Sequence, residues 1–133
     1  MESAQRKTRR VSVRIPASIK VSGKPNLEGE IFNISEGGAF VKSESRLAPG
    51  TQVMVTISFA EMKYLSGVVV ELDGPLLELV PNEDPQPGTV KWDRRAEPAG
   101  FGIAFTKLSP DSKDFLSRLI QYFETLTLAG VSF

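Results

Sequence analysis

Two separated groups of residues carry the kinds of side chain that bind an anionic, planar ligand. The first is a cluster of arginines near the N-terminus, Arg6, Arg9 and Arg10. The second is a short run of polar and small residues, Asn33-Ile34-Ser35-Glu36-Gly37-Gly38. Arginine offers a planar fork of donors that matches phosphate oxygens and the O6/N7 edge of guanine. The second run adds short polar groups and a backbone that a ligand can approach closely. The sequence therefore predicts an anionic-nucleotide site formed by both groups together.

Each group taken alone has a simpler interpretation. The RxxxR spacing of Arg6 and Arg10 also occurs in basic tails that only keep a chain soluble. Asn, Ser and Gly are also the common residues of an ordinary turn, since Asn and Ser side chains bond nearby backbone and the Gly37-Gly38 pair permits a positive φ. A second RxxxR register runs from Arg10 to Arg14. We prefer Arg6 and Arg10 because Arg14 lies inside a strand-like alternation.

Short apolar alternations between residues 11 and 106 predict antiparallel strands in a small barrel or sandwich. In the first alternation, Pro16 predicts an edge or a bulge where the pattern breaks. The candidate strands are Val11 to Val21, Leu27 to Asn33, Ala39 to Ser43, Gln52 to Phe59, Tyr64 to Leu72, Gly88 to Arg94 and Gly100 to Thr106. The Asn/Ser/Gly run therefore falls at the turn between the second and third strands.

The period of the apolar residues changes after Thr106. Ser109 suits the N-cap of a helix, Pro110 its first turn and Asp111 its dipole, so we predict a helix over residues 109–128. Its apolar side chains fall on one stripe, made of Phe115, Leu116, Leu119, Ile120, Phe123 and Leu126. We expect this stripe to cap the barrel. The far end of the stripe, Phe123 and Leu126, could also pair two copies into a homodimer.

The length and composition fit one non-enzymatic domain over residues 1–133, with a flexible basic leader over 1–10, a barrel over 11–106 and the helix over 109–128. The chain has no Cys and no His, which removes thiol nucleophiles, His bases, disulfides and the usual zinc ligand sets. It shows neither a P-loop nor a couple of carboxylates placed for acid/base work. We therefore predict no catalysis, no metal and no cofactor.

The distribution of charge limits the classes of partner. The chain carries 16 basic and 16 acidic residues, yet its leader is locally cationic. The balance argues against a nucleic-acid coat, although a small barrel that binds single strands stays an alternative. No apolar run reaches the roughly 20 residues that span a bilayer, and no apolar region follows the basic N-terminus. We expect a cytoplasmic protein without membrane insertion.

Two other segments have more than one interpretation. Trp92 lies in the run Gly88 to Arg94, where its ring either fills the barrel core or stacks near a bound purine, and we favour burial. The run Pro81 to Pro87 is rich in proline and acidic residues, and we expect an exposed loop there.

On these residues the chain resembles the PilZ domain family, whose members are bacterial receptors for the second messenger cyclic di-GMP. The likeness rests on RxxxR at Arg6 to Arg10, on a (D/N)xSxxG element at Asn33 to Gly38, and on Gly100-Phe101-Gly102-Ile103-Ala104-Phe105 before a helix. The resemblance implies a six-stranded antiparallel barrel with a C-terminal helix and no catalysis. It also implies that ligand binding orders the arginine segment over the barrel.

The resemblance assigns roles to the arginine cluster and to the Asn/Ser/Gly run. By it, Arg6 and Arg10 would clamp phosphates and guanine edges, with Arg9 as an auxiliary contact. Asn33 and Ser35 would hydrogen-bond a guanine, and Gly38 would let the base approach. Gly37 belongs to the same predicted set of ligand-binding residues.

The resemblance leaves the ligand count and the partner open. Gln5 stands where many relatives carry a further arginine, so both a single ligand and a stacked pair are compatible with the motif. Ligand binding would alter a surface offered to an unidentified partner protein, in a process such as motility, adhesion or polysaccharide export. A PilZ-type interaction module that binds no ligand is the alternative.

Overall fold

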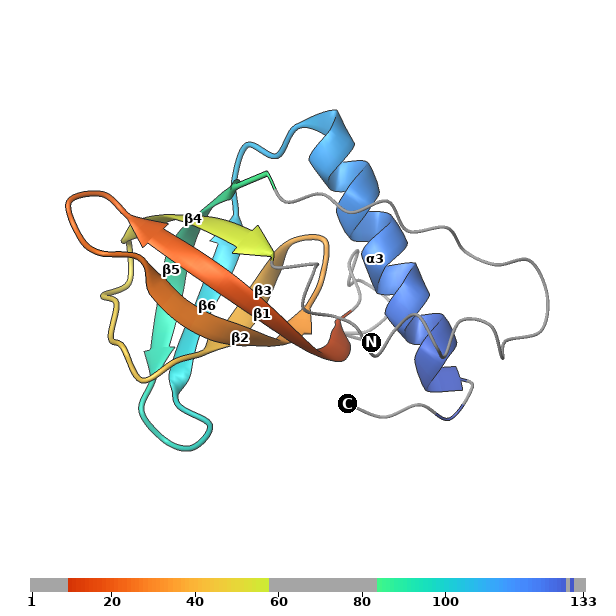
Figure 1. The fold of residues 1–133 in the computed structure, drawn as a ribbon, viewed down its shortest axis with the longest axis horizontal. Coiled ribbons are helices and arrows are strands. Elements are labelled where there is room, and N and C mark those ends of the chain that lie inside the picture. The colour runs from red at the N-terminus through yellow and green to blue at the C-terminus, as the bar shows by residue number, and fades with distance from the viewer. Residues whose placement is uncertain (1–9, 58–83, 129, 131–133) are drawn as a thin grey trace, which may run out of the picture.

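The strands close into a six-stranded antiparallel barrel in the order β1-β2-β3-β6-β5-β4 (Figure 1). This computed structural model describes residues 10–57, 84–128 and 130. The elements are β1 Val11–Val21, β2 Leu27–Ile34, β3 Gly38–Lys42, β4 Gln52–Ile57, β5 Gln86–Arg94, β6 Gly100–Phe105 and the helix α3 Pro110–Leu128. The pairing of β1 with β4 completes the ring, so the fold is a barrel and not a sandwich.

The predicted strands that fall within the described residues are all present, and no end differs from its predicted position by more than two residues. A bulge does occur close to Pro16, between Ser12 and Ile15, but Pro16 itself pairs with Glu30 and the alternation of buried side chains does not break there. The predicted strand Tyr64 to Leu72 lies outside the described residues, as do residues 58 and 59 and the first three residues of the Pro81 to Pro87 run.

The end of that proline-rich run is not an exposed loop, and this prediction was wrong. Gln86 and Pro87 begin β5, where they pair with Val55 and Met54 of β4, and the Gln86 side chain is buried. Proline is tolerated here because the pairing of β5 with β6 begins only at Gly88, so the missing N–H of Pro87 lies at the start of a strand.

The barrel forms because each strand presents apolar side chains to one face at a period of two. In β1 the side chains of Val11, Val13, Ile15, Ala17, Ile19 and Val21 are all buried, and the residues between them are exposed or half-buried. These side chains join those of the other strands in one core cluster. Closure leaves none of the strands of this ring with an unpaired outer edge.

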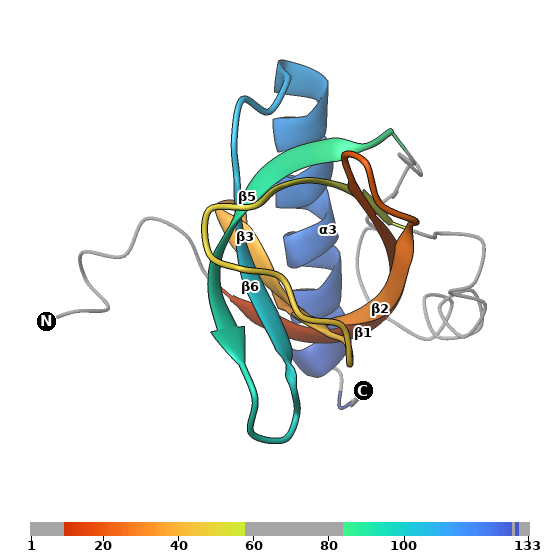
Figure 2. The same cartoon turned by 90° about the vertical axis from the view of Figure 1, so that its left-hand side faces the viewer.

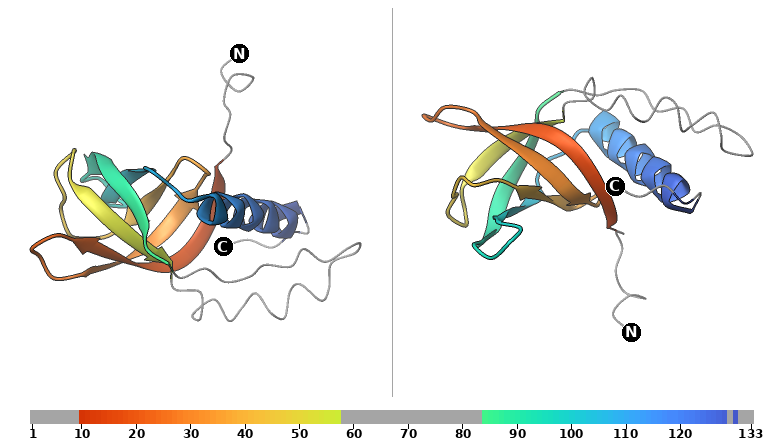
Figure 3. Two further views of the ribbon diagram at one scale, coloured as in Figure 1. Left: turned by 90° about the horizontal axis from the view of Figure 1, so that it is seen from above. Right: turned by 60° about the horizontal axis from the view of Figure 1, so that its bottom comes forward.

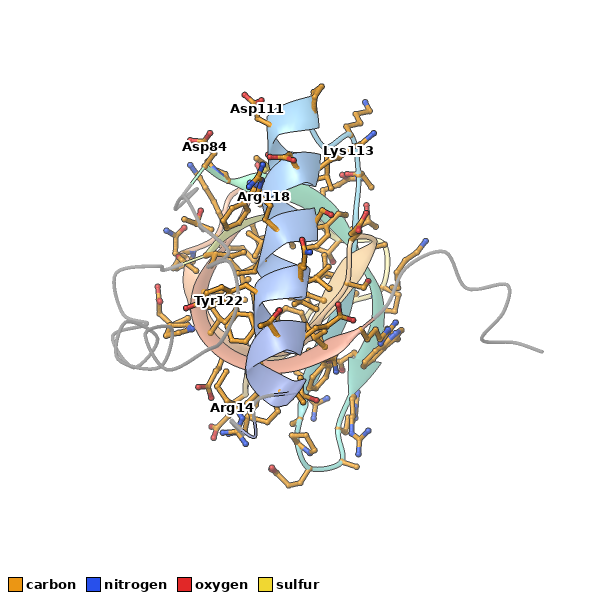
Figure 4. The ribbon with its side chains drawn as sticks, turned by 90° about the vertical axis from the view of Figure 1, so that its right-hand side faces the viewer. Arg14, Asp84, Asp111, Lys113, Arg118 and Tyr122 are labelled. Atoms are coloured by element: carbon orange, nitrogen blue, oxygen red, sulfur yellow. The ribbon has the colours of Figure 1, made fainter. Side chains whose placement is uncertain are left out.

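The helix α3 covers one end of the barrel, as expected (Figures 1 and 2). In both views of Figure 3 it lies at one end of the barrel. The Ser109 hydroxyl accepts the backbone N–H of Ser112 at 3.1 Å, which confirms the predicted N-cap. Seen from the helix side, Asp111 and Lys113 mark its first turn (Figure 4). Within the described residues, no helix is long and apolar enough to cross a membrane.

The apolar stripe of α3 belongs to the core of the chain. The side chains of Phe115, Leu116, Leu119, Ile120, Tyr122 and Phe123 lie in the same buried cluster as the barrel interior. Phe123 is fully buried there, so the hypothesis that this end of the stripe pairs two copies was wrong for Phe123. The side chain of Leu126 lies outside the described part of the structure.

Candidate ligand-binding site

The first strand pair brings the end of the leader to the Asn/Ser/Gly turn. Val11 of β1 pairs with Ile34 of β2, so Arg10 and Ser35 leave the sheet next to each other. Both residues line a cavity of about 330 Å³, together with Gly37 and Gly38 of the turn. The remaining lining residues come from β3, β5 and β6 and are Ala39, Lys91, Trp92, Gly102, Ile103 and Ala104. The predicted residues Arg6 and Arg9 lie outside the described residues.

The turn between β2 and β3 is held by Ser35. Its hydroxyl oxygen accepts the backbone N–H of Gly37 at 3.1 Å and that of Gly38 at 3.2 Å. The backbone N–H of Ser35 donates to the Gly38 carbonyl at 2.8 Å. When a serine hydroxyl accepts the backbone N–H groups two and three residues ahead, this side chain takes the place of a backbone carbonyl in holding the turn. Ser35 therefore holds the turn that forms one wall of the cavity. This structural role is separate from any contact with a ligand.

Gly38 is required by packing between strands and not by its backbone angle. The Gly37-Gly38 pair would permit a positive φ, but neither residue uses it: the described glycines with that angle are Gly23, Gly50 and Gly130. A Cβ on Gly38 would instead overlap the carbonyl oxygen of Ile103 on β6. The missing side chain lets β3 and β6 approach each other beside the cavity.

Asn33 lies close to the cavity but does not line it. It pairs with Ser12 of β1 and Phe40 of β3, and the register of β2 against β3 shifts between Ile31 and Asn33. Its Oδ1 is buried and has no hydrogen-bond partner among the described residues. A buried acceptor without a donor is costly. The described residues therefore leave this oxygen without a donor, and an incoming donor must uncover it to reach it.

Trp92 is not a core residue, and this prediction was wrong. It is 42% exposed and lines the cavity. The cause is a bulge: the register of β5 against β6 shifts between Val90 and Trp92. In a regular strand Trp92 would share the inward face with Gly88 and Val90, both of which are buried. One extra residue in the strand turns the indole to the outer face of the barrel.

The described walls of the cavity suit an anion. Arg10 and Lys91 are the charged residues among the described residues that line it, and no described Asp or Glu does so. A second cavity, of about 460 Å³, has the opposite character, because Glu28, Glu30, Glu44 and Glu97 line it with Lys42. A phosphate-bearing ligand is therefore favoured by the first cavity and opposed by the second.

Sequence reasoning missed Lys91 as a site residue and placed Trp92 in the core. Both follow from the bulge in β5, which no local residue pattern announces. Gly102, directly opposite Trp92 in the register, was the available signal, since glycine inside a strand often marks the close approach of another group.

The PilZ domain model matches residues 4–122. The chain belongs to the PilZ domain family. PilZ domains are binding and regulatory modules. No curated protein sequence matches this chain. In the described chain no group of three or more Asp, Glu, His or Cys side chains is placed to hold a metal ion.

Three solved structures share the PilZ fold of this chain. The PilZ domain of YcgR from Escherichia coli, solved with c-di-GMP, has a TM-score of 0.66 at 12% identity over 95% of this chain and 96% of that one. The Bacillus subtilis inhibitor of motility, MotI/DgrA, has a TM-score of 0.64 at 14% identity over 96% of this chain and 54% of that one, so this chain spans about half its length. The PilZ domain of CeSA from a cellulose-synthesizing bacterium has a TM-score of 0.53 at 22% identity over 87% of this chain and 98% of that one.

Proposed function

We propose that this protein is a receptor for cyclic di-GMP, which binds in the cavity between the β2–β3 turn, β5 and β6. Membership in the PilZ family supports this function, and so does the similar PilZ domain of YcgR, which was solved with c-di-GMP. The observation that carries the proposal is the meeting of Arg10, Lys91 and the Ser35–Gly38 turn in one cavity whose described walls hold no carboxylate.

The residues in and near the cavity would recognise different parts of the ligand. Arg10 supplies a guanidinium fork for a phosphate or for the O6/N7 edge of a guanine. The unpartnered Oδ1 of Asn33 accepts an N–H of the base, which also satisfies a buried acceptor. Arg6 acts with Arg10 through the RxxxR spacing, and Arg9 contributes a further cation. Gly37 and Gly38 keep the turn free of side chains where the ligand enters.

Binding couples to a partner through the N-terminal segment. Because Arg10 directly precedes β1, a phosphate held by Arg10 and Arg6 fixes the segment between them over the cavity. The fixing of a segment by a bound ligand is a common switch in signalling proteins. The surface created in this way is the one that we propose a downstream protein reads.

Calorimetric titration with cyclic di-GMP tests the receptor function. We expect heat of binding and a rise in Tm with ligand concentration. We also expect linear guanine dinucleotide to compete only weakly with cyclic di-GMP. Arg10→Ala and Asn33→Ala are each expected to weaken binding about 10- to 100-fold, since each removes a strong hydrogen-bonding group. Lys20→Ala, which removes an exposed cation of β1 outside the cavity, is the matched control and should bind like the parent.

Two results would reject the receptor function. The first is the absence of both heat and thermal stabilisation at high ligand concentration. The second is tighter binding of a random single-stranded oligonucleotide with a steep salt dependence, which would favour a nucleic-acid-binding barrel.

A further inference from the structure

The indole of Trp92 forms a stacked pair on the outside of the barrel. It lies against the ring of Phe40 with 5.4 Å between ring centroids and 15° between ring planes. Phe40 is buried although it points away from the barrel core cluster, because the aromatic rings of neighbouring strands cover it. Trp92 in contrast stays 42% exposed and lines the cavity.

Gly102 makes room for this pair. It lies between the two rings in the sheet, because it pairs with Phe40 on one side and with Trp92 on the other. A Cβ on Gly102 would overlap the Cε2 and Nε1 edge of the indole. Since any other residue would push the ring away, the glycine lets the indole rest on the β6 backbone.

The stack is supported on its far side as well. Phe32 of β2 contacts Phe40 edge-on, with 6.4 Å between centroids, and the Arg14 guanidinium lies 4.3 Å from the centroid of Phe32. The three rings therefore form a row across β5, β6, β3 and β2, with a cation at its end. Aromatic pairs in such arrangements add attraction beyond the area they bury. The row holds the indole in one place before a ligand arrives.

We propose that Trp92 stacks on a purine base of the bound ligand, and that Phe40 and Gly102 are positioning residues that hold the indole for this contact. The proposal rests on the proposed function and adds to it how the cavity selects the class of base. Stacking is open to every base, but a two-ring purine offers more overlap with an indole than a one-ring pyrimidine. Trp92 thus selects purines, while polar groups such as Asn33 distinguish guanine from adenine.

Titrations with three cyclic dinucleotides test the stacking role. We expect the parent chain to bind cyclic di-GMP more tightly than cyclic di-AMP, and cyclic di-AMP more tightly than cyclic di-UMP. Trp92→Ala should weaken binding of cyclic di-GMP about 5- to 150-fold, which corresponds to the loss of one base–aromatic stack. The same change should affect cyclic di-UMP much less, so the ratio of purine to pyrimidine affinity falls. Trp92→Phe should restore most of this ratio.

The fluorescence of the indole gives a second readout. Trp92 is the single tryptophan of the chain, so its emission reports on the cavity alone. Cyclic di-GMP should quench this emission with the half-saturation found by calorimetry. Gly102→Ala leaves the indole in the chain but displaces it, and should lower both the quenching and the purine preference. Phe40→Leu should act in the same direction. Lys20→Ala, outside the cavity, should change neither.

The outcomes separate this inference from the function on which it rests. If Trp92→Ala and Gly102→Ala keep the parent's affinities and its preference for purines, the stacking role is wrong and the receptor function stands. If the parent chain binds none of the three dinucleotides, both are wrong. Should Trp92→Ala fail to fold, as judged by circular dichroism, quenching in the parent and in Gly102→Ala still decides: emission unchanged by bound ligand overturns the proposal.

Discussion

The Ser35 hydroxyl accepts the backbone N–H of Gly38 at 3.2 Å, while the Gly38 carbonyl accepts the backbone N–H of Ser35 at 2.8 Å. These reciprocal bonds close the turn that forms one wall of the cavity. The polar groups of the turn therefore serve the fold before any ligand binds, and changes at either residue affect stability as well as binding.

Replacement of Ser35 tests its part in the turn. Ser35→Ala removes the acceptor of two backbone N–H groups at a buried position. We expect a loss of about 1 to 3 kcal/mol in the free energy of unfolding, because these donors lose their partner. Urea denaturation measures the loss. Ser117→Ala, at an exposed position of α3, is the control and should change stability little. Equal stability of the two variants would contradict the structural role of Ser35.

Gly38 and Gly102 each lie close to a neighbouring group, and replacement by alanine should affect stability differently at the two positions. Gly38→Ala places a methyl group against the backbone carbonyl of Ile103, which cannot move without disturbing β6. We expect a loss of about 1 to 3 kcal/mol in the free energy of unfolding. Gly102→Ala meets the edge of the Trp92 side chain, which is 42% exposed and can be displaced outward without moving a strand, so it should cost less. Thermal and urea denaturation of both variants would show the order, and the reverse order would contradict it.

The cap of α3 offers a test that is independent of the ligand. Ser109→Ala removes the hydroxyl that accepts the Ser112 backbone N–H, and should lower the free energy of unfolding by about 1 kcal/mol. Ser109→Asp retains an acceptor and places a negative charge at the helix N-terminus, so it should keep most of the stability. If both variants lose the same amount, the hydroxyl is not acting as a cap.

The burial of Tyr122 predicts a loss of stability at alkaline pH. Removal from water raises the pKa of this phenol above its ordinary value, since burial disfavours the tyrosinate. The unfolded chain therefore releases the proton near pH 10, before the folded chain does. The contribution of this group is complete below that pH and is lost as pH rises toward the folded-state pKa.

A comparison with phenylalanine isolates this group. Tyr122→Phe should flatten the decline in the free energy of unfolding above about pH 10. Urea denaturation at a series of alkaline pH values measures the slope, and ultraviolet absorbance follows the formation of tyrosinate. Tyr64, the other tyrosine of the chain, is present in both proteins and cancels. Identical slopes would show that Tyr122 titrates normally.

Local patterns predicted most of the fold. The alternation in Val11 to Val21 needs no partner to be visible, and neither does the Ser109 cap of α3. What the local patterns did not show depends on contacts between distant strands. Trp92 faces outward because of a bulge against β6, and Gly38 is needed because of the Ile103 carbonyl on the same strand.

The arrangement of the candidate site was predicted in part for the same reason. Arg10, Ser35, Gly37 and Gly38 line one cavity, as expected from motifs read along the chain. Lys91 was missed because it reaches the cavity from β5, whose register no nearby residue reveals.

Val11 and Ile34 are the first residue pair between β1 and β2. They lie beside the cavity, because the adjoining residues Arg10 and Ser35 line it. A force that pulls on the chain before Val11 therefore acts on this residue pair before it acts on any other part of the barrel. A force applied there reaches the cavity through this one pair and the two residues that adjoin it.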